Sequence, residues 1–92
     1  MSEISADARP AIARGLRMQW EPAQNAHVLL YPEGMVKLNA SAAAIMNLCD
    51  GARSIRDIVT GLEQMYGASG LTGEVTAFVT LAAQKNWLEI RG

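Results

Sequence analysis

The sequence predicts an α+β domain in which a three-stranded antiparallel β-meander precedes three helices, an order similar to that of a winged helix-turn-helix domain. Apolar residues alternate with polar ones in the first half of the chain and recur every three to four residues in the second half. Pro, Gly, Asn and Asp fall at the expected boundaries. The length of 92 residues suits one domain, expected over residues 10–92 after a flexible N-terminal tail at residues 1–9.

The three strands are expected between residues 15 and 39. Apolar and polar residues alternate from Leu16 to Trp20, as in a half-buried strand. Residues 26–31 form a second strand that is apolar on both faces, and Pro32 and Gly34 supply the following turn. The chain returns as a third strand, Met35–Leu38, which lies at the edge of the predicted sheet. This meander needs a helical layer, because three strands alone bury too little apolar surface.

Three helices are expected after Asn39, and capping residues mark where they begin. Ser41 or Asn39 can cap the first, Ser54 with Asp57 suits a capping box for the second, and Thr72 can cap the third. Residues 87–90 close the chain as an extended segment or a packed tail. The expected apolar stripes are Ala42, Ile45, Met46 and Cys49; then Ile55, Ile58, Val59, Leu62, Met65 and Tyr66; then Val75, Phe78, Val79 and Ala82.

Composition argues against several functional classes. The chain has one cysteine and one histidine, which excludes a structural zinc site or an internal disulfide. His27 has no acidic partner at strand spacing, Cys49 lies on an apolar stripe, and Asp50 is explained by a helix end, so we expect no enzyme activity and no cofactor. A net charge of −1 disfavours nucleic acid. The sequence lacks a membrane span or a signal peptide, and we expect a cytoplasmic protein.

The edge strand at residues 35–38 is the strongest candidate for an interaction site. Only Lys37 discourages its pairing with another strand, so an extended peptide could add to this edge. A homodimer is the alternative, because Leu29, Tyr31 and Met35 are expected to form an apolar patch that the helices cannot cover. The residues by themselves favour neither interpretation, and the two are compatible.

Five short segments carry a resemblance to a known family: LLYPEG at residues 29–34, KLN at 37–39, CDG at 49–51, GLRMQW at 15–20 and IRDIV at 55–59. They resemble the PqqD family of coenzyme PQQ (pyrroloquinoline quinone) synthesis proteins. The resemblance extends over nearly the whole chain. It implies a peptide chaperone without chemistry of its own, a recognition element for ribosomally made peptides. Such a chaperone binds the precursor peptide PqqA and presents it to PqqE, a radical S-adenosylmethionine enzyme that cross-links a Glu and a Tyr of that peptide.

The resemblance also implies where the peptide binds. In related recognition domains the peptide adds to the third strand and rests against the third helix. The corresponding residues here are Met35, Val36, Lys37 and Leu38 on the strand, and Val75, Phe78, Val79 and Ala82 on the helix. A winged-helix DNA-binding regulator, or another protein-interaction domain, is the alternative function. The third helix would bring almost no positive charge to DNA, because it carries Glu74 and only the terminal Lys85.

Overall fold

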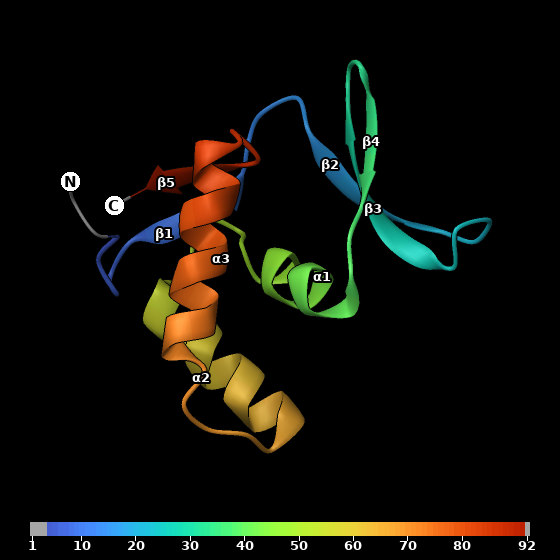
Figure 1. Cartoon of the computed structure of the whole chain (residues 1–92). Coiled ribbons are helices and arrows are strands. Elements are labelled where there is room, and N and C mark those ends of the chain that lie inside the picture. The colour runs from blue at the N-terminus through green and yellow to red at the C-terminus, as the bar shows by residue number, and fades with distance from the viewer. Residues whose placement is uncertain (1–3, 92) are drawn as a thin grey trace.

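Five strands and three helices make up the structure, a computed structural model that describes residues 4–91 (Figure 1). The order is β1, β2, β3, β4, α1, α2, α3, β5. The strands are β1 Arg9–Ile12, β2 Arg17–Glu21, β3 Ala26–Tyr31, β4 Gly34–Lys37 and β5 Leu88–Arg91, and the helices are α1 Ala40–Asn47, α2 Ile55–Tyr66 and α3 Thr72–Gln84. The predicted α+β class is confirmed, whereas the likeness to a winged helix-turn-helix domain stays a prediction.

The predicted meander is present as the sheet β2-β3-β4, with β3 in the middle and both pairings antiparallel. Two residues, Pro32 and Glu33, connect β3 to β4, and Tyr31 lies opposite Gly34. Asn25 closes the β2–β3 connection with a φ of 51°, a left-handed conformation that Asn tolerates better than most residues. Alternation of side chains predicted β2, whereas β3 was predicted as a strand that is apolar on both faces, and successive residues of β3 are buried.

A second sheet that the sequence did not predict joins the two ends of the chain. Strand β1 pairs antiparallel with β5, and Pro10 lies opposite Ile90. Residues 87–90 were expected as an extended segment or a packed tail, and residues 88–90 of this segment enter a strand. Gly51 approaches this sheet closely: its amide donates to the Pro10 carbonyl over 2.9 Å, and a Cβ at this position would lie 3.3 Å from that of Ala11.

Residues 6–8 pack against the start of α2, where a flexible tail over residues 1–9 was expected. Ala8 is buried, and its carbonyl accepts a hydrogen bond from the Ile55 amide at 2.9 Å. The Ala6 carbonyl accepts from the Arg56 amide at 3.0 Å, and Asp7 pairs with the Arg56 guanidinium. These carbonyls satisfy amides at the start of α2 that have no partner within the helix. Residues 4–9 thus belong to the packed domain, and the rest of the expected tail, residues 1–3, lies outside the described residues.

The helix caps follow the sequence in two cases out of three. Asn39 caps α1 by accepting from the Ala42 amide, and Ser54 and Asp57 form the predicted capping box at the start of α2. Gly67 ends α2 in the left-handed conformation. The prediction for α3 is wrong, because Thr72 is the first helical residue and Leu71, the N-cap, has no capping side chain; the Leu71 amide donates to the Glu63 carboxylate at 3.0 Å.

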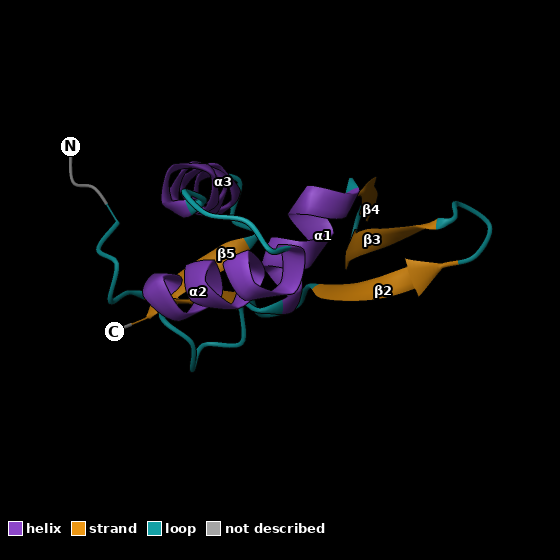
Figure 2. Cartoon of the chain, turned by 90° about the horizontal axis from the view of Figure 1, so that it is seen from below, coloured by secondary structure: helices purple, strands orange, loops and turns teal. Residues whose placement is uncertain are grey.

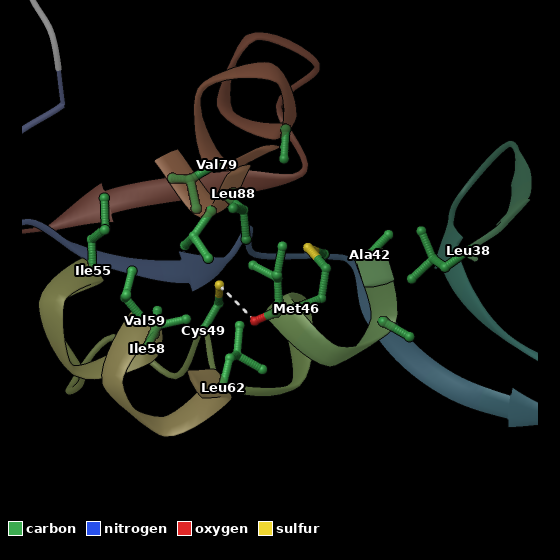
Figure 3. Packing of buried hydrophobic residues seen from close by; sticks show 14 of the residues in the cluster. Leu38, Ala42, Met46, Cys49, Ile55, Ile58, Val59, Leu62, Val79 and Leu88 are labelled. Atoms are coloured by element: carbon green, nitrogen blue, oxygen red, sulfur yellow. Dashed lines mark hydrogen bonds between the residues drawn. The ribbon is translucent and has the colours of Figure 1, made fainter. Parts of the chain in front are cut away.

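The core lies between the three helices and the β1–β5 pair, and Figure 3 shows its central side chains. The helices were expected to cover the three-stranded sheet, but α1 is the helix that packs against β3, while α2 packs against α3 and α3 against β5. Figure 2 shows the consequence: the sheet β2-β3-β4 projects to one side of the body, with α1 between the sheet and the other helices. Much of the sheet is therefore left for contacts outside the chain.

Candidate functional site

Strand β4 has one open edge, and the hydrogen-bond pattern identifies which residues serve it. The Leu38 amide donates to the His27 carbonyl of β3 at 2.9 Å. In an antiparallel pair, residues on one strand alternate between pointing their backbone groups at the partner and away from it. With Val36 opposite Leu29, the backbone groups of Val36 face β3 as those of Leu38 do. The N–H and C=O groups of Met35 and Lys37 therefore face the open edge.

The side chains of the predicted strand site divide between the two faces of the sheet. Met35 is 48% exposed and Lys37 is exposed, whereas Val36 is half-buried and Leu38 is buried in the core cluster. Leu38 follows the last residue of β4 and anchors the strand to the core. Three of the four predicted strand residues are thus accessible, and the fourth holds the edge in position.

A hollow of about 540 Å³ lies at the start of β4, where the β3–β4 turn meets the end of α3. Its walls carry apolar side chains from both sides, with one acid and one base at its margin. Lys85 lies over the ring of Trp87, with its Nζ 5.6 Å from the ring centroid. The lining residues are Leu16, Tyr31, Pro32, Glu33, Val36, Lys85, Asn86 and Trp87.

The predicted helix site is mostly core. Val75, Val79 and Ala82 are buried in the central cluster, so an outside peptide could reach them only if the domain opened. Phe78 is half-buried and packs against the same cluster, and it is the accessible member of the four. The apolar stripe of α3 faces inward because α2 and β5 pack on it.

The residues that sequence reasoning missed in this region are Leu16, Tyr31 and Trp87. They are half-buried and they line the hollow together with Val36. Strand periodicity could have found Tyr31, because it shares a sheet face with Leu29, the residue opposite Val36. No local signal could have found Trp87, which reaches this place through the pairing of β5 with β1.

The apolar patch that was expected to drive self-association does not form as predicted, because Met35 lies opposite Leu30 and therefore on the other face of the sheet from Leu29 and Tyr31. Leu29 has no exposed surface and Tyr31 is half-buried, which leaves Met35 as the freely exposed member. The expectation was wrong for Leu29 because α1 packs against β3 and provides an intramolecular partner. The homodimer itself stays a prediction.

Three titratable side chains that the sequence analysis considered are Cys49, Asp50 and His27, and the structure shows what surrounds each of them. Burial, with a smaller contribution from the nearby Asp50 charge, raises the pKa of the Cys49 thiol to about 12. Hydrogen bonds from the Arg53 and Ala52 amides lower the pKa of Asp50 below its ordinary value. His27 lies edge-on to Trp20, with ring centroids 5.2 Å apart. Residues 4–91 hold no cluster of three or more His, Cys, Asp or Glu side chains suited to a metal ion.

This arrangement suits the binding of an extended chain. An open strand edge offers backbone donors and acceptors, and a neighbouring apolar hollow offers room for side chains.

Between residues 4 and 91, no helix is both long enough and apolar enough to cross a lipid bilayer.

Comparison with known proteins gives a consistent result. The family model described as coenzyme PQQ synthesis protein D (PqqD) matches residues 26–88. A protein of Stutzerimonas stutzeri named PqqA binding protein is 50% identical over 92 residues, which cover 99% of this chain and all of the relative. The protein of the same name from Azotobacter vinelandii is 52% identical over 91 residues, covering 98% of this chain and 99% of the relative.

A solved structure extends the similarity to three dimensions. The solution NMR structure of the PqqD truncation of Methylobacterium extorquens PqqCD superposes with a TM-score of 0.72 at 34% sequence identity. The match covers 96% of this chain and 95% of the other. That protein is described as a functional, stand-alone recognition element for ribosomally synthesized and post-translationally modified peptides.

Proposed function

The chain belongs to the PqqD family, and we propose from this membership that it binds the peptide PqqA in the synthesis of pyrroloquinoline quinone. The peptide adds as an extra strand to the open edge of β4. The observation that carries this proposal is the juxtaposition of the outward backbone groups of Met35 and Lys37 with the apolar hollow at the start of the same strand. Main-chain hydrogen bonds supply affinity, and alternate side chains of the peptide meet the hollow and supply selectivity.

The predicted site residues then have distinct roles. Met35 and Lys37 bond to the peptide backbone, Val36 forms part of the hollow, and Leu38 anchors the strand. On α3, Phe78 contacts the peptide. The buried residues Val75, Val79 and Ala82 hold the helix in place from within the core.

Lys37→Pro tests strand addition directly, because it removes an amide that faces the open edge and leaves the pairing with β3 unaffected. Proline is tolerated on edge strands, so the variant should fold. The loss of one hydrogen bond and the steric block by the ring should weaken binding of a synthetic PqqA peptide about tenfold or more, measured by calorimetry. Lys37→Ala is the matched control, because it keeps the amide and should bind within about threefold of the unmodified protein.

The two ways in which this experiment can contradict the proposal are separable. Equal affinity of Lys37→Pro and the unmodified protein would overturn strand addition at β4 while leaving peptide binding intact. Absence of any affinity for PqqA in the unmodified protein would overturn the function itself. Amide chemical shifts provide the second measurement, and the largest changes on binding should fall at residues 35–37.

We further propose that the chain acts as a chaperone without chemistry of its own and presents the bound peptide to the radical S-adenosylmethionine enzyme PqqE. A peptide held along one strand remains exposed on its outer side, and its remaining residues are free to enter another active site. Size-exclusion chromatography of the three purified components should yield one complex. Elution of PqqE apart from the other two at micromolar concentration would contradict this role.

A further inference from the structure

The two faces of the sheet β2-β3-β4 differ at the open edge of β4. We call the face on which α1 packs the inner face and the opposite one the outer face. Val36 belongs to the inner face and lines the hollow at the start of β4. Met35 lies opposite Leu30, on the outer face. Lys37 lies opposite Val28 on that same outer face. A strand that pairs with β4 extends both faces, so its successive residues meet two different surroundings.

Lys37 is the basic residue of β4, and the sheet offers its charge no partner. It takes part in none of the ion pairs among residues 4–91. Glu21 is the acidic residue on the outer face of the sheet, but it lies on β2, opposite Ala26 of β3. Two strand spacings put its backbone at least about 10 Å from that of Lys37. The Glu21 carboxylate also accepts a hydrogen bond from the Ala23 amide at 3.2 Å. The Lys37 ammonium is therefore available to an acidic group from outside the chain.

Packing on the outer face supports the aliphatic stem of Lys37. Val28 has no exposed surface, although it lies outside the central core cluster. Lys37 lies opposite Val28 on one side and Gln19 lies opposite it on the other. A lysine that borders an apolar residue covers it with its methylene groups and keeps its ammonium in water. The charge of Lys37 is thereby placed on the outer face, next to the open edge.

The hollow on the inner face favours a different kind of side chain. Among the described residues that line it, the charged ones are Glu33 and Lys85, one of each sign. Lys85 lies over the ring of Trp87, which occupies part of its positive charge. The other lining residues are mainly apolar. A peptide side chain that enters the hollow beside Val36 is therefore best apolar.

We propose that the β4 site selects two adjacent residues of the bound peptide: an apolar residue opposite Val36, which fills the hollow, and an acidic residue opposite Lys37, which pairs with its ammonium. This inference rests on the proposed function, because it requires that the peptide adds to β4. Neighbouring residues of a strand point to opposite faces whichever way the chain runs, so the pair is adjacent in either direction. Directly opposite residues have Cβ atoms about 5 Å apart, which is within reach of an ion pair.

Lysine on an edge strand has a second explanation, because it discourages edge-to-edge pairing between proteins. Reversing the charge separates the two roles. A glutamate discourages such pairing as a lysine does, so under this explanation Lys37→Glu should bind PqqA as the unmodified protein does. If Lys37 pairs with an acidic residue, the substitution turns attraction into repulsion and should weaken PqqA binding about tenfold. Lys37→Ala loses only the attraction, which agrees with its expected change of no more than about threefold.

Calorimetry with a set of synthetic PqqA peptides, each carrying Lys in place of one acidic residue, tests the assignment. One replacement should weaken binding to the unmodified protein about tenfold, and Lys37→Glu should recover most of that loss for this peptide alone. A residue next to this position should be apolar. Its replacement by Ala should weaken binding to the unmodified protein and to Lys37→Glu by the same factor, because that side chain lies on the inner face.

Arg9→Glu is the matched control, because it makes the same change in net charge at an exposed residue of β1. Figure 1 shows β1 well apart from β4, so this variant should bind every peptide as the unmodified protein does. Equal affinity of Lys37→Glu and the unmodified protein for every peptide would overturn the selection, whereas strand addition would still be tested by Lys37→Pro. Recovery at an acidic residue with polar neighbours on both sides would overturn the two-residue pattern.

Discussion

Cys49 illustrates how the surroundings of a reactive side chain can make it inert. It lies on α1's inward side just beyond the helix end, and its Sγ donates a hydrogen bond to the Ile45 carbonyl over 3.3 Å, the dashed line in Figure 3. Burial raises the pKa of this thiol to about 12, because the thiolate cannot be solvated there. The reactive form is therefore almost absent at neutral pH.

We predict that Cys49 in the folded protein does not react with a thiol reagent and that it reacts fully in urea. At pH 9 the thiolate fraction is still only about a thousandth, so native labelling should remain slow even there. Cys49→Ala should lower the free energy of unfolding by about 1 kcal/mol and leave peptide affinity unchanged. Rapid native labelling, or loss of peptide binding by a folded Cys49→Ala variant, would show a functional thiol.

Asp50 is the residue that makes acid stability testable. Its carboxylate accepts from the amides of Ala52 and Arg53 at 2.9 Å and pairs with the Arg53 guanidinium, which keeps its pKa below the ordinary value. A carboxyl group whose pKa is lower in the folded state stabilises the fold above its unfolded pKa of about 4. This contribution is lost as the pH falls through the lower, folded pKa.

Asp50→Asn keeps an acceptor for the two amides but cannot bind a proton. We therefore expect the free energy of unfolding of the variant to depend less steeply on pH below about 4 than that of the unmodified protein. Urea titrations at a series of pH values measure this slope. Identical slopes for the two proteins would show that the Asp50 hydrogen bonds do not form in solution.

At the scale of elements, the two termini and the α1–α2 connection hold the fold together. Strand β1 pairs with β5, Asp50 bridges to Ala11, and the Gly51 amide donates to Pro10. The carbonyls of Ala6 and Ala8 complete the start of α2. These contacts make the first described residues part of the structure, and they position α2 and α3 relative to the second sheet.

A chain that begins at Arg9 should be less stable than the full chain by about 2 kcal/mol or more. It loses two hydrogen bonds at the start of α2 and the buried side chain of Ala8, each worth about 1 kcal/mol. Urea denaturation followed by circular dichroism measures the difference. Arg56→Ala is the control for the exposed pair with Asp7 and should cost less than about 1 kcal/mol. Equal stability of both chains would show that residues 4–8 do not stabilise the domain and behave as a tail.

At the scale of the whole molecule, the charge distribution disfavours DNA binding. The net charge is −1, and α3 carries Glu74 without any Lys or Arg between Thr72 and Gln84. Phosphate contacts from Lys and Arg supply essentially all non-specific affinity for DNA. A chain with this distribution is suited to peptide and protein surfaces of low charge.

We predict no appreciable binding to duplex DNA at low ionic strength, where electrostatic attraction is strongest. An electrophoretic mobility shift assay at about 20 mM salt is the measurement, with a basic winged-helix protein as the positive control. A shift at micromolar protein that weakens steeply as salt is added would favour the DNA-binding alternative.

Much of the fold could be predicted from the sequence, because the signals that specify it are local. Alternation, an apolar β-forming run and a turn sequence specified the meander. Helix ends were marked by capping residues whose bonds reach only a few positions, namely Asn39, Ser54 with Asp57, and Gly67. The edge of β4 followed from the order of the strands. The sequence did not show which residues of β4 have backbone groups that face the open edge, because that depends on the register of β4 with β3.

By itself, the sequence determined the α+β class, the three strands of the meander, the three helices and the family. The tertiary structure alone decided the pairing of β1 with β5, the packing of Ala8 on α2 and the hollow that Trp87 shares with Val36. It also decided that Met65 and Tyr66, at the end of the predicted apolar stripe of α2, are exposed. The reason is physical: periodicity reveals which face of an element is apolar, but whether that face is covered depends on elements distant in the chain.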